Sequence, residues 1–140
     1  MAHGVAAALG VHASIPHGLA CAVMLPQALK VNREAGRTML AQAGRVMRQS
    51  LINSNLSELS ARELAKMASL GSDDAATEFV IQILEHLCER IGIPITLTKL
   101  GVSRDQIPAI VASSHGNSMS GNPKEISDEE LTTLLESMTA

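Results

Sequence analysis

The shortage of aromatic residues constrains the fold of this chain more than any other feature. Its 140 residues include one phenylalanine, Phe79, and no tryptophan or tyrosine. Hydrophobic residues still make up 46% of the chain, so alanine, leucine, isoleucine, valine and seven methionines have to fill the core. Such side chains suit close helix packing better than a sheet sandwich. We therefore expect an all-α protein, of a length that fits one domain with a single core.

Breakers and capping residues divide the chain into helices. The first expected helices cover residues 2–10, 17–34 and 37–50, and a short one at about 60–69 follows a polar loop at 51–60. A long helix is then capped by Ser72 or Asp73, and the last two helices are capped by Ser103 and Ser127. Gln106 and Glu130 complete capping boxes with these last two serines,. Pro26 should kink or restart the second helix. The segment 95–100 is the only strand candidate, and it is short.

Helical spacing of apolar residues predicts which side of each helix is buried. The methionines Met24, Met39, Met47 and Met67 are expected to fill the core. The predicted buried faces are Met39, Leu40, Ala43 and Met47; Val80, Ile81, Leu84, Leu87, Cys88 and Ile91; Ile107, Ile110 and Val111; and Leu131, Leu134, Leu135 and Met138.

Charge and cysteine content exclude several classes of protein. The net charge is −3 with no basic cluster, which argues against a nucleic-acid partner,. No apolar run approaches the ~20 residues of a membrane span, so we expect a soluble, cytoplasmic protein. Cys21 and Cys88 form no C-x-x-C pair and read as reduced, buried thiols,. The acidic pairs Asp73–Asp74 and Glu129–Glu130 complement helix dipoles, which explains them without catalysis.

Three of the five histidines, His3, His12 and His17, stand in the first 17 residues. Their separations match no compact metal motif, and a histidine pair across a helix and turn is more often hydrogen-bonded structure than a pair of ligands. Two imidazoles are also fewer than the three or four protein ligands of a usual zinc or iron site. From spacing alone, metal binding is the less favoured of the two readings.

Read as whole strings, two segments resemble a known family. H-x-x-A-x-x-L-G from His3, followed by I-P-H-G-L-A-x-A-x-x-L-P from Ile15, resembles the metal-binding signature of the iron-containing (group III) alcohol dehydrogenases. The tail from Leu97, with L-G-V, D-x-I-P, a G-N-P loop and a D-x-E-x-x-x-L-L helix, is similar to that family's ending. The resemblance covers the chain from end to end.

The resemblance implies a fold and a metal site. Family members join an N-terminal Rossmann-like dinucleotide domain to a C-terminal helical domain of the dehydroquinate synthase-like fold, and an Asp and three His hold a metal in the cleft between them. Carried over to this chain, two of these ligands are His3 and His17, 14 residues apart as in the family. Where members often have His or Glu, this chain has Ala7, which removes a proton-relay role there. His12 falls in the variable connection and reads as surface or loop.

Residues 1–140 would then be a single helical domain that lacks the Rossmann-like domain and the segment bearing the other two ligands. The resemblance implies Fe²⁺ or Zn²⁺, NAD(P) and a small alcohol or aldehyde substrate for the intact enzyme. The chain alone is expected to bind metal weakly, to have no dehydrogenase activity, and to self-associate through the exposed cleft face as a homo-oligomer. The alternative is a free-standing helical protein with a structural or partner-binding role and no catalysis.

His115 and the loop Gly116 to Pro123 form the last candidate region. The glycine and asparagine content predicts a tight turn with positive φ. The alternative is a minor role beside the substrate, since the corresponding loop approaches the cleft in the family that the chain resembles.

Overall fold

The computed structural model describes residues 1–53 and 71–139, and within these ranges every regular element is helical. The helices are α1 (Ala2–Ala13), α2 (His17–Val31), α3 (Arg37–Asn53), α5 (Asp73–Arg90), α6 (Ile107–Ser113), α7 (Asn117–Ser120) and α8 (Asp128–Ser137), with 3₁₀ turns η1 (Thr98–Leu100) and η2 (Arg104–Gln106). The expectation of an all-α fold is confirmed. The strand candidate at 95–100 contains η1 instead, and the expected helix at 60–69 lies outside the described residues.

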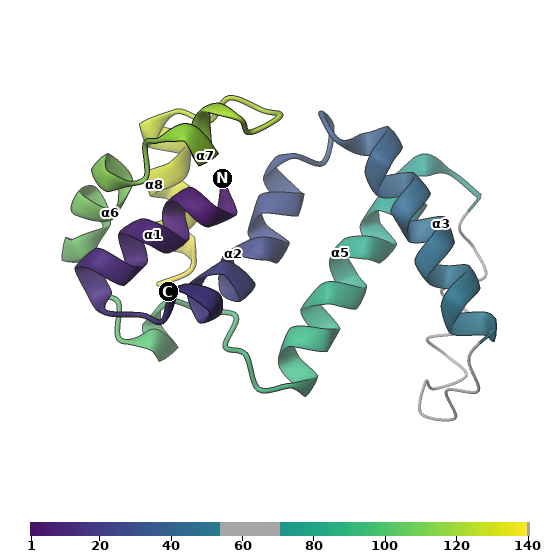
Figure 1. The fold of residues 1–140 in the computed structure, drawn as a ribbon, viewed down its shortest axis with the longest axis horizontal. Helices are drawn as coiled ribbons and strands as arrows, with labels where there is room; N and C mark the ends of the chain where they lie inside the picture. The colour runs from purple at the N-terminus through teal and green to yellow at the C-terminus, as the bar shows by residue number, and fades with distance from the viewer. Residues whose placement is uncertain (54–70, 140) are drawn as a thin grey trace.

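The main core gathers around α1, which packs against α2 and against the group of α6 and α7 (Figure 1). The fully buried side chains include Val5 and Leu9 of α1 and Met24 of α2. The predicted apolar sides of the last two longer helices are largely confirmed, because Ile107, Ile110, Val111, Leu131, Leu135 and Met138 are all buried. Segments from both ends of the sequence therefore share one core.

The pair α3 and α5 forms a second packed unit beside α2 (Figure 1). The side of α3 that spacing predicted to be buried is only partly so: Leu40, Ala43 and Met47 are half-buried, and Met39 is 78% exposed. The fully buried residues of α3 are Ala41 and Gly44. A Cβ on Gly44 would overlap the carbonyl oxygen of Ala76 in α5. The two backbones approach closely, so the contact selects the smallest side chains and not the largest apolar ones.

The apolar stripe predicted for α5 is only partly correct. Val80, Ile81 and Cys88 are buried as expected, whereas Leu87 and Ile91 at its C-terminal end are 50% and 61% exposed. Ion pairs add to the contacts along α5 and are, in chain order, Lys30–Glu85, Arg33–Glu78, Arg37–Asp74 and Arg45–Asp73. Asp73 and Asp74 thus pair with arginines as well as complementing the helix dipole.

The expected caps are present. The hydroxyl of Ser72 accepts from the Ala75 N–H at 3.2 Å. Ser103 with Gln106, and Ser127 with Glu130, form capping boxes, as their spacing predicted. Helix ends without such a cap were predicted less well, since α1 runs to Ala13 and α2 stops at Val31.

Two local conformations shape the start of the molecule. Ser14 ends α1 in the left-handed region, with φ 55°, and Pro16 then precedes the first turn of α2. The helix α2 continues through Pro26 as a single element, so the expected restart does not occur. Pro26 is buried and supplies no N–H to the carbonyl of Ala22.

The sulfur-containing residues occupy varied environments. Both cysteines are free thiols; Cys88 is buried and Cys21 is only half-buried. Met24 fills the core as expected, Met39 does not, and Met67 lies outside the described residues. In the described part of the chain, none of the helices has the length and apolar character needed to cross a membrane.

Candidate metal centre

The first turns of α1 and α2 bring His3 and His17 together. Their ring centroids are 4.6 Å apart, with the ring planes at 75°, an edge-to-face arrangement. Both side chains are exposed. The left-handed Ser14 turns the chain after α1, and Pro16, with φ −53° and ψ 130°, sets the direction in which α2 starts from His17. The pair that the family resemblance singled out is therefore a pair in space.

Each imidazole has one further side-chain partner. His3 Nδ1 lies 3.3 Å from the hydroxyl oxygen of Ser118 in α7. His17 Nε2 lies 3.5 Å from the sulfur of Cys21, one turn further along α2. Sequence analysis missed both partners: the i, i+4 spacing of His17 and Cys21 could have shown the second, whereas no sequence signal joins residues 115 positions apart.

The chemistry of these donors fits a divalent transition metal. Neutral imidazole nitrogens bind Zn²⁺ at about 2.0–2.1 Å, and imidazole also suits iron. Two nitrogens on one tetrahedral ion are then about 3.3 Å apart, a spacing compatible with ring centroids 4.6 Å apart. Among residues 1–53 and 71–139, no three His, Cys, Asp or Glu side chains are placed to hold an ion together. His3 and His17 thus fit a metal as a partial ligand set.

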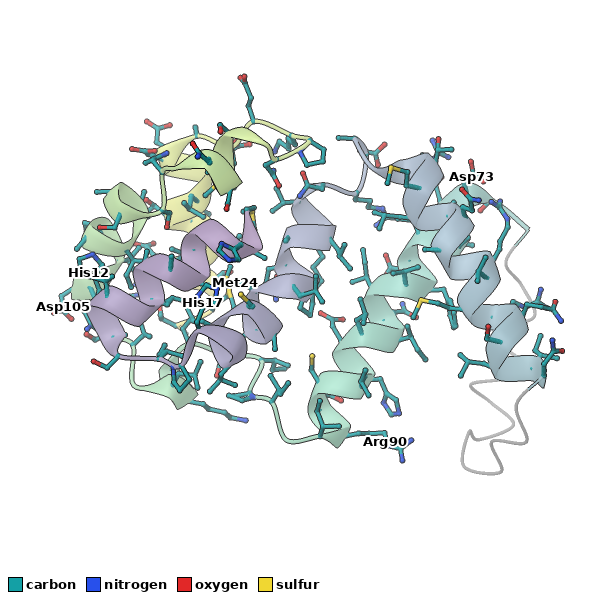
Figure 2. All side chains as sticks on the ribbon, viewed as in Figure 1. His12, His17, Met24, Asp73, Arg90 and Asp105 are labelled. Atoms are coloured by element: carbon teal, nitrogen blue, oxygen red, sulfur yellow. The ribbon has the colours of Figure 1, made fainter. Side chains whose placement is uncertain are left out.

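His12 and His115 lie outside this pair. His12 was predicted to lie on the surface or in a loop, in the variable connection between the two halves of the signature. That prediction is wrong, because His12 belongs to the last turn of α1 and is half-buried. Its Nε2 is 2.7 Å from Ser113 Oγ, and Figure 2 labels it on the same side of the molecule as Asp105. His115 Nε2 is 2.7 Å from Asp128 Oδ1, with both side chains exposed. Each of the two has a hydrogen-bonding role outside the pair.

The loop after His115 also differs from the prediction. Neither Gly116 nor Gly121 has the left-handed conformation expected of a tight turn: Gly116 is extended, with φ 176°, and Gly121 has φ −85°. The four residues between them form α7 instead. Its Ser118 approaches His3, so this segment contributes a side chain to the histidine pair.

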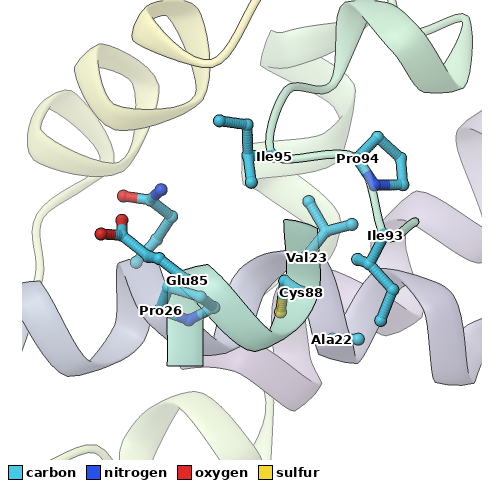
Figure 3. A pocket seen from close by; sticks show the side chains of 9 residues that line it. Ala22, Val23, Pro26, Glu85, Cys88, Ile93, Pro94 and Ile95 are labelled. Carbon is cyan, nitrogen blue, oxygen red and sulfur yellow. The ribbon is translucent and has the colours of Figure 1, made fainter. Parts of the chain in front are cut away.

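A small hollow lies between α2, the end of α5 and residues 93–95 (Figure 3). Its lining is largely apolar and includes Cys88, with Glu85 and Gln27 as the polar exceptions. The space is about 10 Å³, room for about one water molecule. Burial, and then the neighbouring Glu85, raise the pKa of the Cys88 thiol, which makes it a poor nucleophile or ligand. The hollow is a packing feature and not a candidate site.

Comparisons with known proteins match one family model and several curated relatives. The family model described as "Fe-containing alcohol dehydrogenase family, C-terminal" matches residues 1–139. Lactaldehyde reductase of Escherichia coli (strain K12) is 27% identical over 135 residues, which cover 96% of this chain and 31% of that protein. For 1,3-propanediol dehydrogenase of Klebsiella pneumoniae the identity is 31% over 134 residues, with 94% and 30% covered.

A solved structure gives the same result at the level of the fold. A crystal structure of 1,3-propanediol oxidoreductase superposes with a TM-score of 0.76 at 25% identity, covering 98% of this chain and 32% of that one. The chain therefore spans about a third of the length of the relatives that it matches.

Proposed function

The chain belongs to the Fe-containing alcohol dehydrogenase family, as the helical C-terminal domain, and from that premise we propose that it is the metal-binding portion of an NAD(P)-dependent alcohol or aldehyde oxidoreductase. The observation that carries the proposal is the His3–His17 pair, with ring centroids 4.6 Å apart at the first turns of two packed helices. The two residues are the proposed ligands for Fe²⁺ or Zn²⁺.

The proposed share of this chain in the reaction is to hold and orient. A metal held by His3 and His17 would supply Lewis-acid polarisation of the substrate oxygen, and a nicotinamide cofactor would supply hydride chemistry. His3 and His17 would hold the metal through ring nitrogens, and Pro16 fixes the direction of the helix that carries His17. Because the chain covers about a third of its relatives, we propose that the dinucleotide domain and the other ligands belong to a further part of the protein.

Metal binding by the chain itself tests the proposal. Co²⁺ should produce visible absorption bands and raise the Tm, by about 9 °C when the ion is present at about 100 times its Kd. His3→Ala and His17→Ala should each abolish both responses. His115→Ala is the matched control, since it removes an exposed imidazole paired with Asp128, and it should keep them. Co²⁺ responses that survive the first two substitutions would contradict the assignment of ligands.

Activity of the isolated chain is a separate prediction. With two of the four ligands and no dinucleotide domain, it should show no turnover of alcohols with NAD⁺ or NADP⁺. Turnover that persists through repurification and disappears in His17→Ala would contradict the proposal that the chain is inactive alone. If Co²⁺ has no effect at any concentration, the alternative of a structural helical protein gains support. The homo-oligomer expected from the sequence stays a prediction, which light scattering can test.

A further inference from the structure

The contact between Ser118 and His3 bears on how His3 can bind a metal. A neutral imidazole has one N–H and one nitrogen with a free lone pair, and only the latter can be a ligand. The hydrogen bond made by one ring nitrogen decides which nitrogen keeps the proton. Ser118 Oγ lies 3.3 Å from Nδ1, and a hydroxyl there can accept an Nδ1–H, the tautomer that leaves the Nε2 lone pair for a metal.

The helix that carries Ser118 is fixed against the first turn of α1. The next residue, Met119, is buried. The amine of Met1, two residues before His3, donates to the Ser118 carbonyl oxygen at 3.1 Å. Gly4 completes the contact, because a Cβ there would come within 2.8 Å of the Ser114 carbonyl oxygen. The backbones that carry His3 and Ser118 are thus held in one arrangement.

A pair of asparagines fixes the turn after α7 to the end of α2. Asn32 Nδ2 donates to Asn122 Oδ1 at 2.8 Å, and Asn122 Nδ2 donates to Asn32 Oδ1 at 2.9 Å. The N–H of Lys124 also donates to Asn32 Oδ1, at 3.1 Å. Asn32 is only 9% exposed, and buried amides with satisfied hydrogen bonds are costly to rearrange. Ser118 is therefore placed relative to both histidine-bearing helices.

We propose that Ser118 is a positioning residue for His3: its Oγ accepts the Nδ1–H, which holds the ring orientation and leaves Nε2 as the metal-binding nitrogen. The inference rests on the proposed function, because a free Nε2 matters only if His3 is a metal ligand. The tautomer itself is a property of the metal-free chain. Without this acceptor, a neutral histidine side chain in water carries its proton mainly on Nε2, the wrong nitrogen for such a ligand.

The tautomer can be measured directly. Two-bond ¹H–¹⁵N spectra of the ¹⁵N-histidine-labelled, metal-free chain at about pH 8.5 should show His3 protonated mainly on Nδ1. Ser118→Ala should shift the proton mainly to Nε2, and Ser118→Thr should restore it to Nδ1. Ser120→Ala is the matched control: that hydroxyl, on the same short helix, donates to the Asn117 carbonyl oxygen, and its loss should leave His3 unchanged.

A second measurement connects the tautomer to metal binding. Ser118→Ala should weaken Co²⁺ affinity about 10- to 100-fold, the usual effect of losing such a partner, and Ser120→Ala should not. A His3 ring that carries its proton on Nε2 in the parent chain, or a tautomer unchanged in Ser118→Ala, would overturn the inference. A parent chain that binds no Co²⁺ would instead overturn the proposed function, so the two failures are distinguishable.

Discussion

At the scale of single residues, Gly44 shows how closely two helices can meet. Its position leaves no space for a methyl group, because a Cβ would overlap the backbone of Ala76. Gly44→Ala should lower the free energy of unfolding by about 1–3 kcal/mol, the usual cost of overpacking, although alanine favours helix more than glycine does. Urea denaturation followed by circular dichroism measures the change.

Gly18 provides the comparison for that substitution. It also lies within a helix, but no atom other than those of its chain neighbours and its own helix backbone is within 4 Å of the place where its Cβ would be. Gly18→Ala should therefore leave stability unchanged or raise it by up to about 1 kcal/mol. If both alanines raised the free energy of unfolding, the close approach of α3 and α5 would be contradicted.

At the residue scale, a motif was the useful signal in the sequence. It singled out His3 and His17 by their strings and their separation of 14, and the structure brings their rings together, while their role as ligands stays a prediction. Ser118 could not be found in this way, because its contact with His3 depends on tertiary packing across 115 positions. Spacing also misjudged Met39, since helical periodicity weighs hydrophobicity and ignores how near a partner backbone comes.

At the scale of elements, α8 contains a charge-dependent cap. Glu130 accepts a hydrogen bond from the Lys124 ammonium group and another from the Ser127 N–H. These interactions, the first being the larger cause, lower the pKa of the Glu130 carboxyl below its ordinary value of 4.5. The folded state thus favours the ionised carboxylate more than the unfolded chain does.

Such a group stabilises the fold above its unfolded pKa, and its contribution is lost as pH falls through the lower, folded value. Glu130→Gln should therefore have a lower Tm than the parent chain at pH 7, and the difference should shrink as pH falls below about 4.5. Glu129→Gln changes the same charge in the same turn and controls for the helix dipole. A Tm difference that is constant between pH 7 and pH 3 would rule out ionisation of Glu130 as its cause.

Elements with local signals were predictable and the others were not. Serine caps and capping boxes marked the starts of α5, η2 and α8. The helix α7 has only four residues, too few to show a period, and its glycines and asparagines suggested a turn. Pro26 suggested a break in α2, yet the buried packing of its neighbours keeps the helix continuous.

At the scale of the whole molecule, stability is divided between two packed units. The main core draws on α1, α2, α6, α7 and α8 and includes no residue of α3 or α5. The helix α3 buries only Ala41 and Gly44, whereas α1 buries Val5, Leu9 and three smaller residues. Opening α3 therefore exposes less apolar surface than opening α1 does.

Native-state hydrogen exchange should reveal this division. Amides in α3 should exchange through a local opening that costs less free energy than the global unfolding that exposes α1. Low concentrations of denaturant should accelerate amide exchange more steeply in α1 than in α3. The dependence of the opening free energy on denaturant concentration reports how much surface the opening exposes. Equal protection and equal slopes in the two helices would show instead that the chain opens only as one unit.

The position of α1 also affects how the chain folds during synthesis. The contacts of α1 with α6 and α7 involve residues from Ile107 onward, so this first helix cannot complete its core until more than a hundred further residues have left the ribosome. Until then Val5 and Leu9, both fully buried in the folded protein, stay only partly covered. Helices that wait in this way for a distant partner expose apolar surface during synthesis, and chaperones bind such surface.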